Sequence, residues 1–239
     1  MLILLLTAVI PALALVYFIY RKDKYEKEPT SQLLQGFGYG ALSAMVAPLI
    51  SYPLLYMGLY TIDATTAGES IRLALFGAAI PEELVKFFFL WLLLRNNKHY
   101  DEYVDGMVYA VCVGMGFAAF ENIGYLIANM ESWATIGLLR ALIPIPGHFF
   151  FAVTMGYFYS NATFGDPGQR KMNYMMAVLV PIALHFLFDA LLMVSNAMGG
   201  VGALLALFMG LFVFMARMSK HRFEEHLARD ERSQSSEEE

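Results

Sequence analysis

The stretch GAAIPEELVKFFFL, residues 77–90, places two adjacent carboxylates and a lysine inside an otherwise apolar segment. Ionisable groups within a membrane span cost about 2.5–3.5 kcal/mol each on insertion scales, and they usually belong to functional sites. In a helix, Lys86 lies four residues after Glu82 and three after Glu83, so the three side chains can meet. One ion pair that eases insertion would explain one glutamate but not two. Pro81 also removes a backbone donor here. The stretch therefore predicts a polar site inside a membrane.

The rest of the chain has the composition of a polytopic membrane protein. Of its 239 residues, 58% are hydrophobic and 15% are charged, whereas a soluble domain carries about 25% charged residues. Several apolar segments reach the roughly 20 residues that cross a bilayer. We expect an all-α bundle of about seven transmembrane helices, near residues 2–20, 33–60, 71–94, 104–128, 133–160, 172–195 and 201–217. These form one transmembrane domain, 1–218, and the charged segment 219–239 is predicted to be a disordered tail.

The basic residues predict the orientation of this bundle. Lysines and arginines follow the first, third, fifth and seventh segments, whereas the loops TIDATTAGES, NMES and NAMGG contain none. Because cytoplasmic loops are enriched in basic residues, the N-terminus is expected outside and the C-terminus in the cytoplasm. The first segment is expected to be a retained helix, since no basic stretch precedes it and RKDKYEK follows it directly.

Other polar side chains lie within the predicted spans. They are Glu121 and Asn122 in the fourth, Arg140 and His148 in the fifth, and His185 and Asp189 in the sixth. At about 1.5 Å per residue, most of the carboxylates and His185 lie roughly 9 to 17 Å from the outer face, and His148 lies roughly 22 Å from it. Scattered ion pairs have no reason to share a depth, so these groups are expected to converge.

Carboxylates and imidazoles that converge in a membrane suggest activation of water. A zinc ion held by such groups would lower the pKa of a bound water and polarise a carbonyl, with a glutamate off the metal as general base. Alternatively, a buried glutamate could activate water without a metal while a histidine and an asparagine steady the oxyanion. Both mechanisms give hydrolysis inside the membrane.

Four ordered motifs resemble those of the PrsW family of bacterial intramembrane proteases. They are Glu82-Glu83-x-x-Lys86, Phe117-x-x-x-Glu121-Asn122, Gly147-His148 and His185-x-x-x-Asp189. The resemblance runs from about residue 1 to 217. It implies a multi-pass protease domain of the bacterial cytoplasmic membrane, related to the CAAX prenyl endopeptidases and the Abi proteins. It also implies site-1 cleavage of a single-pass anti-sigma factor on its extracytoplasmic side, which leads to release of a sigma factor in a stress response.

Residues and resemblance together predict a metal-dependent intramembrane endopeptidase. Glu82 or Glu83 is expected to be the general base, and zinc is the expected metal, with Glu121, His148, His185 and Asp189 as its ligands. The catalytic candidates are Glu82, Glu83, Glu121, His148 and His185, and the supporting residues are Lys86, Asn122 and Arg140. The partners are a single-pass membrane protein and the lipid bilayer, with no role for nucleic acid.

Three other functions fit parts of the pattern. A proton-coupled transporter also places Glu, Lys and His at the midplane, but it would have repeated halves, which the sequence lacks. A non-catalytic membrane chaperone or immunity protein would tolerate loss of Glu82 and His185. A CAAX-type endopeptidase needs a prenylated substrate that arrives from the cytoplasm.

Overall fold

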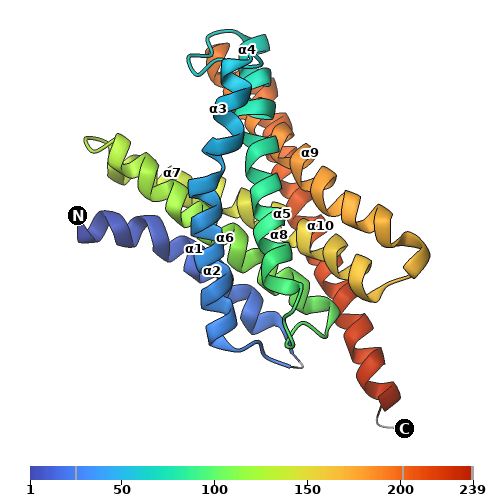
Figure 1. The fold of residues 1–239 in the computed structure, drawn as a ribbon. Coiled ribbons are helices and arrows are strands. Elements are labelled where there is room, and N and C mark those ends of the chain that lie inside the picture. The colour runs from blue at the N-terminus through green and yellow to red at the C-terminus, as the bar shows by residue number, and fades with distance from the viewer. Residues whose placement is uncertain (25, 201, 238–239) are drawn as a thin grey trace.

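In the computed structural model, which describes residues 1–24, 26–200 and 202–237, the protein consists of helices joined by loops (Figure 1). In chain order the elements are α1 (Leu2–Lys22), α2 (Thr30–Val46), α3 (Pro48–Tyr56), α4 (Ala67–Arg72), the π-helix η1 (Leu73–Ala79), α5 (Ile80–Leu94), α6 (Tyr103–Ala128), α7 (Trp133–Leu142), α8 (Pro144–Phe164), the short 3-10 helix η2 (Pro167–Gln169), α9 (Arg170–Ala197) and α10 (Gly202–Glu237). No strand occurs among these residues. The predicted all-α class is confirmed.

Six helical stretches are long and apolar enough to cross a membrane within the described ranges. They are α1, α2 with α3, α6, α7 with α8, η2 with α9, and α10. The remaining predicted segment, 71–94, is also helical without a break and comprises the end of α4, η1 and α5, but Glu82, Glu83 and Lys86 make it more charged than the apolar windows of the other six. The count of seven crossings and the predicted orientation stay predictions.

Helix α6 forms the centre of the bundle and packs against α1, α2 and α8. Glycines allow the backbones to approach closely, as small residues do in membrane helices. A Cβ on Gly40 of α2 would overlap the carbonyl oxygen of Val113, and one on Gly116 of α6 would overlap that of Phe37. On the opposite side, Gly156 of α8 lies equally close to Gly106. These contacts fix α6 between its neighbours.

Prolines coincide with breaks between consecutive helices. Pro48 and Pro144 stand at the first positions of α3 and α8, where a missing N–H costs least. Pro81 stands at the start of α5, directly after η1. Two arms diverge from the base of the molecule, α1 with α7 and α4 with α9 (Figure 1). The breaks let the chain change direction between these arms.

The C-terminal segment continues α10 to Glu237, which differs from the prediction of a disordered tail at 219–239. His226 and Asp230 are four residues apart and both are buried. The Asp230 carboxylate accepts hydrogen bonds from the backbone N–H groups of Tyr103 (2.8 Å) and Val104 (2.9 Å) at the start of α6. The charged composition concealed a buried polar face, and residues 238–239 lie outside the described ranges.

Candidate active site

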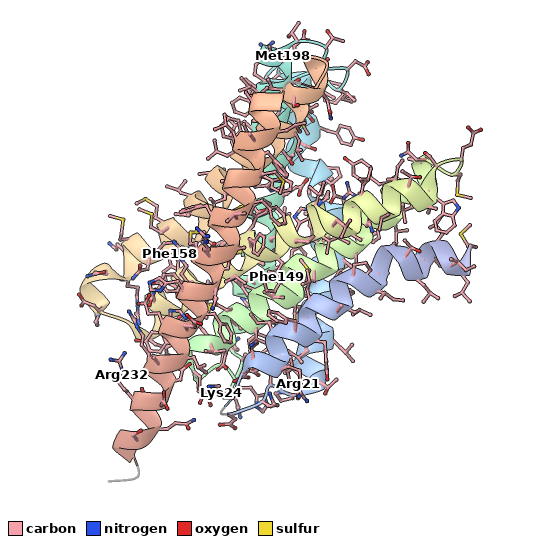
Figure 2. All side chains as sticks on the ribbon, turned by 180° about the vertical axis from the view of Figure 1, so that it is seen from behind. Arg21, Lys24, Phe149, Phe158, Met198 and Arg232 are labelled. Atoms are coloured by element: carbon pink, nitrogen blue, oxygen red, sulfur yellow. The ribbon has the colours of Figure 1, made fainter. Side chains whose placement is uncertain are left out.

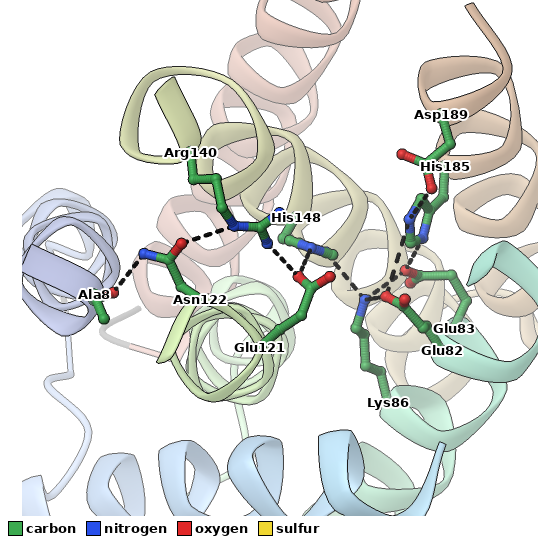
Figure 3. A network of polar contacts seen from close by, with 10 residues as sticks. All are labelled: Ala8, Glu82, Glu83, Lys86, Glu121, Asn122, Arg140, His148, His185 and Asp189. Carbon is green, nitrogen blue, oxygen red and sulfur yellow. Dashed lines mark hydrogen bonds and ion pairs between the residues drawn. The ribbon is translucent and has the colours of Figure 1, made fainter. Parts of the chain in front are cut away.

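The first two turns of α5 bring the charged groups of the opening stretch together. Lys86 Nζ lies 2.8 Å from Glu83 Oε1 and 3.3 Å from Glu82 Oε2. Glu83 is completely buried, and the Lys86 ammonium also lies 4.0 Å from the centre of the Phe117 ring. The predicted convergence of the three side chains on one side of the helix is therefore seen (Figure 3).

Two histidines approach these carboxylates from other helices. His148 of α8 places Nδ1 3.1 Å from Lys86 Nζ, and His185 of α9 places Nδ1 2.8 Å from Glu83 Oε1. The Phe151 ring stacks on His185 with the centroids 4.7 Å apart, which fixes the imidazole plane. Residues more than a hundred positions apart in the chain thus meet at one point (Figure 3).

Four of these residues could hold a metal ion. Glu82, Glu83, His148 and His185 each offer a ligand atom, and these atoms all lie within 4.8 Å of one another. Glu83 Oε2 is buried and has no hydrogen-bond partner among the described residues. Burial of an unpaired carboxylate oxygen is costly, and a cation there would satisfy it. Imidazole and carboxylate are also ordinary zinc ligands, so the site fits a metal.

Glu121 and Asp189, which the sequence analysis named as ligands, lie beside the histidines and outside this group of four. Glu121 Oε2 is 3.1 Å from His148 Nε2, and Asp189 Oδ2 is 3.3 Å from His185 Nε2. Each histidine thus has an outer carboxylate beside Nε2. Nδ1 faces Lys86 Nζ in His148 and Glu83 in His185, and His185 Nε2 also lies 3.9 Å from Glu82 Oε2. Such outer carboxylates typically orient a metal-binding imidazole and fix its tautomer.

The predicted supporting residues form a chain that leads from the site to α1. Arg140 Nη2 donates to Glu121 Oε2 and Arg140 Nε donates to Asn122 Oδ1, both at 2.8 Å. Asn122 Nδ2 in turn donates to the Ala8 carbonyl oxygen at 3.1 Å (Figure 3). The Arg140 guanidinium also lies 3.8 Å from the centre of the Tyr125 ring. This chain ties α7, α6 and α1 together behind the site.

A cleft of about 640 Å³ opens onto the site between α2, α3, η1 and α6. Of the four residues that could hold a metal, only Glu82 lines the cleft, and Glu121 lines it as well. Much of the remaining lining is small or aromatic and consists of Ala44, Ala47, Gly77, Gly124, Ala128, Tyr52, Phe117, Phe120 and Tyr125. The two carboxylates are thus the acidic groups that a molecule in the cleft would meet.

Sequence reasoning missed Phe151, the ring stacked on His185, and the residues of the cleft. Phe151 follows His148 by three residues and so lies one helical turn further on, but nothing distinguishes it from the neighbouring phenylalanines. The cleft depends on how α3 and η1 pack, and local spacing does not specify that packing.

Comparison with known proteins agrees with the motifs. The family profile described as "PrsW family intramembrane metalloprotease" matches residues 28–218. Protease PrsW of Clostridioides difficile (strain 630) is 36% identical over 194 residues, which cover 80% of each chain. Protease PrsW of Geobacillus kaustophilus (strain HTA426) is 36% identical over 210 residues, 88% of this chain and 85% of the relative. Protease PrsW of Bacillus subtilis (strain 168) is 30% identical over 182 residues, 76% of this chain and 79% of the relative.

No solved structure matches the chain at a significant level. The six membrane-length helices and the bacterial relatives together show a multi-pass membrane protein of a bacterium. The chain belongs to the PrsW family of intramembrane metalloproteases.

Proposed function

We propose that this peptidase hydrolyses a membrane-anchored protein with Glu82 as general base and with zinc held by Glu83, His148 and His185. The observation that carries the assignment is that Glu82 lines the cleft while the other three residues lie behind it. A base must reach the attacking water and the substrate. Ligands can be fully enclosed, as Glu83 is.

Two histidines and one glutamate form a common ligand set for catalytic zinc. Such sites use three protein ligands and leave one position for water or substrate. The ligand atoms would be His148 Nδ1, His185 Nδ1 and a Glu83 oxygen, because the carboxylates nearest to the Nε2 atoms of the two rings are those of Glu121 and Asp189; His185 Nε2 lies further, 3.9 Å, from Glu82 Oε2. We infer that Glu121 and Asp189 position these rings and are not ligands themselves.

Zinc bound at this site would lower the pKa of a water molecule and polarise the scissile carbonyl. Glu82 removes a proton from the attacking water while the oxygen bonds to the carbonyl carbon. The same carboxyl group then returns the proton to the leaving nitrogen as the C–N bond breaks. Lys86, 3.3 Å from Glu82, offsets the negative charge of the adjacent carboxylates.

We further propose that the substrate is a single-span anti-sigma factor cut near the extracytoplasmic side. Resemblance to the PrsW motifs supports the substrate class, and the predicted depth of Glu82 supports the position of the cut. The small residues that line the cleft leave room for an extended peptide to approach Glu82 and Glu121. A helical substrate must unwind there, because a helix shields its peptide bonds.

Cleavage of a purified single-span anti-sigma-factor fragment in detergent, with zinc measured on the same samples, tests the proposal. Glu82→Gln is expected to keep zinc and to lose about 10²–10⁴-fold in kcat, the usual contribution of a general base. Glu83→Gln and His185→Ala are expected to lose both zinc and cleavage. Glu131→Gln, which alters an exposed carboxylate in the loop before α7, serves as the matched control.

Other outcomes would contradict parts of the assignment. Loss of zinc in Glu82→Gln would make Glu82 a ligand. Cleavage that is insensitive to chelators in metal-free protein would support the glutamate mechanism. Normal cleavage by all three variants would show that none of these residues is needed for catalysis. If the enzyme cleaves other single-span proteins but not the anti-sigma-factor fragment, only the proposed substrate is wrong.

A further inference from the structure

A second large groove lies on another face of the molecule, between α1, α8 and α10. Its volume is about 440 Å³, and its walls carry Phe18, Phe149, Phe150 and Phe223. None of the active-site residues lines it. Figure 2 shows α1 and α10 diverging on this face, with Phe149 of α8 between them. The groove is therefore separate from the catalytic cleft.

Lysines surround the groove at the end that the basic residues predict to be cytoplasmic. Lys22, Lys24 and Lys220 belong to its lining, and so does one acidic residue, Glu224. Lys220 Nζ lies 3.7 Å from Glu224, but both side chains are largely exposed and such a pair is weak. The groove thus combines aromatic walls with a net positive rim, and Lys24 and Arg21 lie near its lower end in Figure 2.

Ser219 adds a buried polar group to the lining. Its residue surface is only 5% exposed, and its hydroxyl has no hydrogen-bond partner in the described part of the chain. A buried hydroxyl without a partner is destabilising. A ligand oxygen in the groove would satisfy it.

We propose that this groove binds one anionic phospholipid of the cytoplasmic leaflet. One acyl chain would lie along Phe149, Phe150 and Val153, and the phosphate would face the lysines, with Ser219 donating to a phosphate or ester oxygen. A neutral lipid would leave the lysines without a counter-charge, and a soluble anion would leave the aromatic walls exposed. Basic pockets between membrane helices on the cytoplasmic side are suited to anionic head groups.

The lipid would also support the active site indirectly. Phe149 and Phe150 line the groove, while His148, the preceding residue, is one of the four residues that could hold a metal. A molecule packed against this turn of α8 would restrict its movement away from α6. We therefore expect the bound lipid to raise thermal stability, whatever the substrate of the protease is.

Native mass spectrometry of the full chain in detergent tests the proposal. The protein would be titrated with phosphatidylglycerol or with phosphatidylcholine of the same acyl composition. Wild type is expected to bind one phosphatidylglycerol at least about tenfold more tightly than phosphatidylcholine. The triple variant Lys22→Gln/Lys24→Gln/Lys220→Gln is expected to bind it about a hundredfold more weakly, at about 1 kcal/mol for each lysine.

Two controls keep the result specific to the groove. The variant Arg95→Gln/Lys98→Gln/Lys171→Gln removes the same charge from positions outside the groove and should bind like wild type. Ala216→Trp fills the groove while keeping all three lysines, and it should abolish retention of phosphatidylglycerol. If the two lipids bind equally, or if Ala216→Trp binds normally, the proposal is wrong. If the triple variant does not fold, the result from Ala216→Trp decides.

Discussion

At the scale of single residues, Lys86 has the most unusual position in the molecule. Its ammonium lies between Glu82, Glu83 and His148 Nδ1, at distances of 2.8 to 3.3 Å. These are three of the four groups that could bind a metal. Lysine therefore supplies positive charge to the same carboxylates that a metal would neutralise, and the two cations would share these ligands.

We predict that Lys86→Met destabilises the metal-free protein by about 3–5 kcal/mol, because removal of one partner leaves buried carboxylates uncompensated. Zinc should restore more stability to this variant than it adds to wild type. Thermal unfolding in detergent, with chelator or with zinc, measures both effects. Equal stabilisation of the two proteins by zinc would show that Lys86 and the metal do not share these carboxylates.

Asp189→Asn separates a positioning role from a ligand role. If Asp189 only orients His185 through Nε2, the substitution should weaken zinc binding by 10–100-fold, which is the usual effect of altering such an outer partner. Competition with a chelator of known affinity measures the change. Complete loss of zinc, as expected for His185→Ala, would instead place Asp189 among the ligands.

At the scale of elements, the crossing of α2 and α6 limits how far the helices can shift beside the cleft. Gly40 and Gly116 allow their backbones to meet, and α2 continues into Ala44 and Ala47 of the cleft lining. The same crossing therefore sets both the packing of the bundle and one wall of the site.

Gly40→Ala is expected to cost about 1–3 kcal/mol, since its Cβ would overlap the Val113 carbonyl and overpacking of a tight contact is destabilising. Activity should fall with stability, because the wall of the cleft moves. Gly38→Ala is the matched control, as no described atom lies within 4 Å of its Cβ position. Thermal unfolding and cleavage rates of both variants provide the test, and equal behaviour would argue against the close crossing.

The sequence predicted where the helices lie better than it predicted where they are interrupted. Apolar length predicted the spans, and the spacing of Glu82, Glu83 and Lys86 predicted their contact. The π-helix η1 was not predicted, because its shift in hydrogen bonding depends on neighbours such as α9 and α3. His148 and His185 were expected near Glu82 and Glu83. The sequence does not show which ring nitrogen faces these glutamates, because that depends on the contacts of the rings with Glu121 and Asp189.

At the scale of the whole molecule, acidic groups also lie outside the cleft, where the chain before α2 and the end of α10 contact α6 and the residue before it. Glu28 accepts a hydrogen bond from the Tyr109 hydroxyl, and Glu102 accepts one from Gln234 Nε2 of α10. Burial is the main cause that raises the pKa of Glu28 from its ordinary value of 4.5 to about 7. Burial, followed by the nearby Asp230 carboxylate, raises the pKa of Glu102 to about 7 as well.

These shifts predict that the folded protein becomes less stable as pH rises from about 4.5 to about 7. Both carboxyls bind protons more tightly when folded than when unfolded, so the stability that they contribute is fully present below pH 4.5 and is lost as pH passes the folded pKa. The unfolding temperature in detergent should therefore fall across this range. Glu28→Gln/Glu102→Gln should flatten the profile, whereas Glu131→Gln should not. An unchanged profile in the double variant would assign the dependence to other groups.

The contact between Asp230 and the start of α6 also has a consequence for biogenesis. A ribosome makes α6 before α10, and it makes α10 after every other described helix. Until α10 folds back, the N–H groups of Tyr103 and Val104 lack the carboxylate that accepts their hydrogen bonds. The most buried helix of the bundle, which carries Glu121, can enter the bilayer during translation, but its first turn is completed only after α10 has been synthesised.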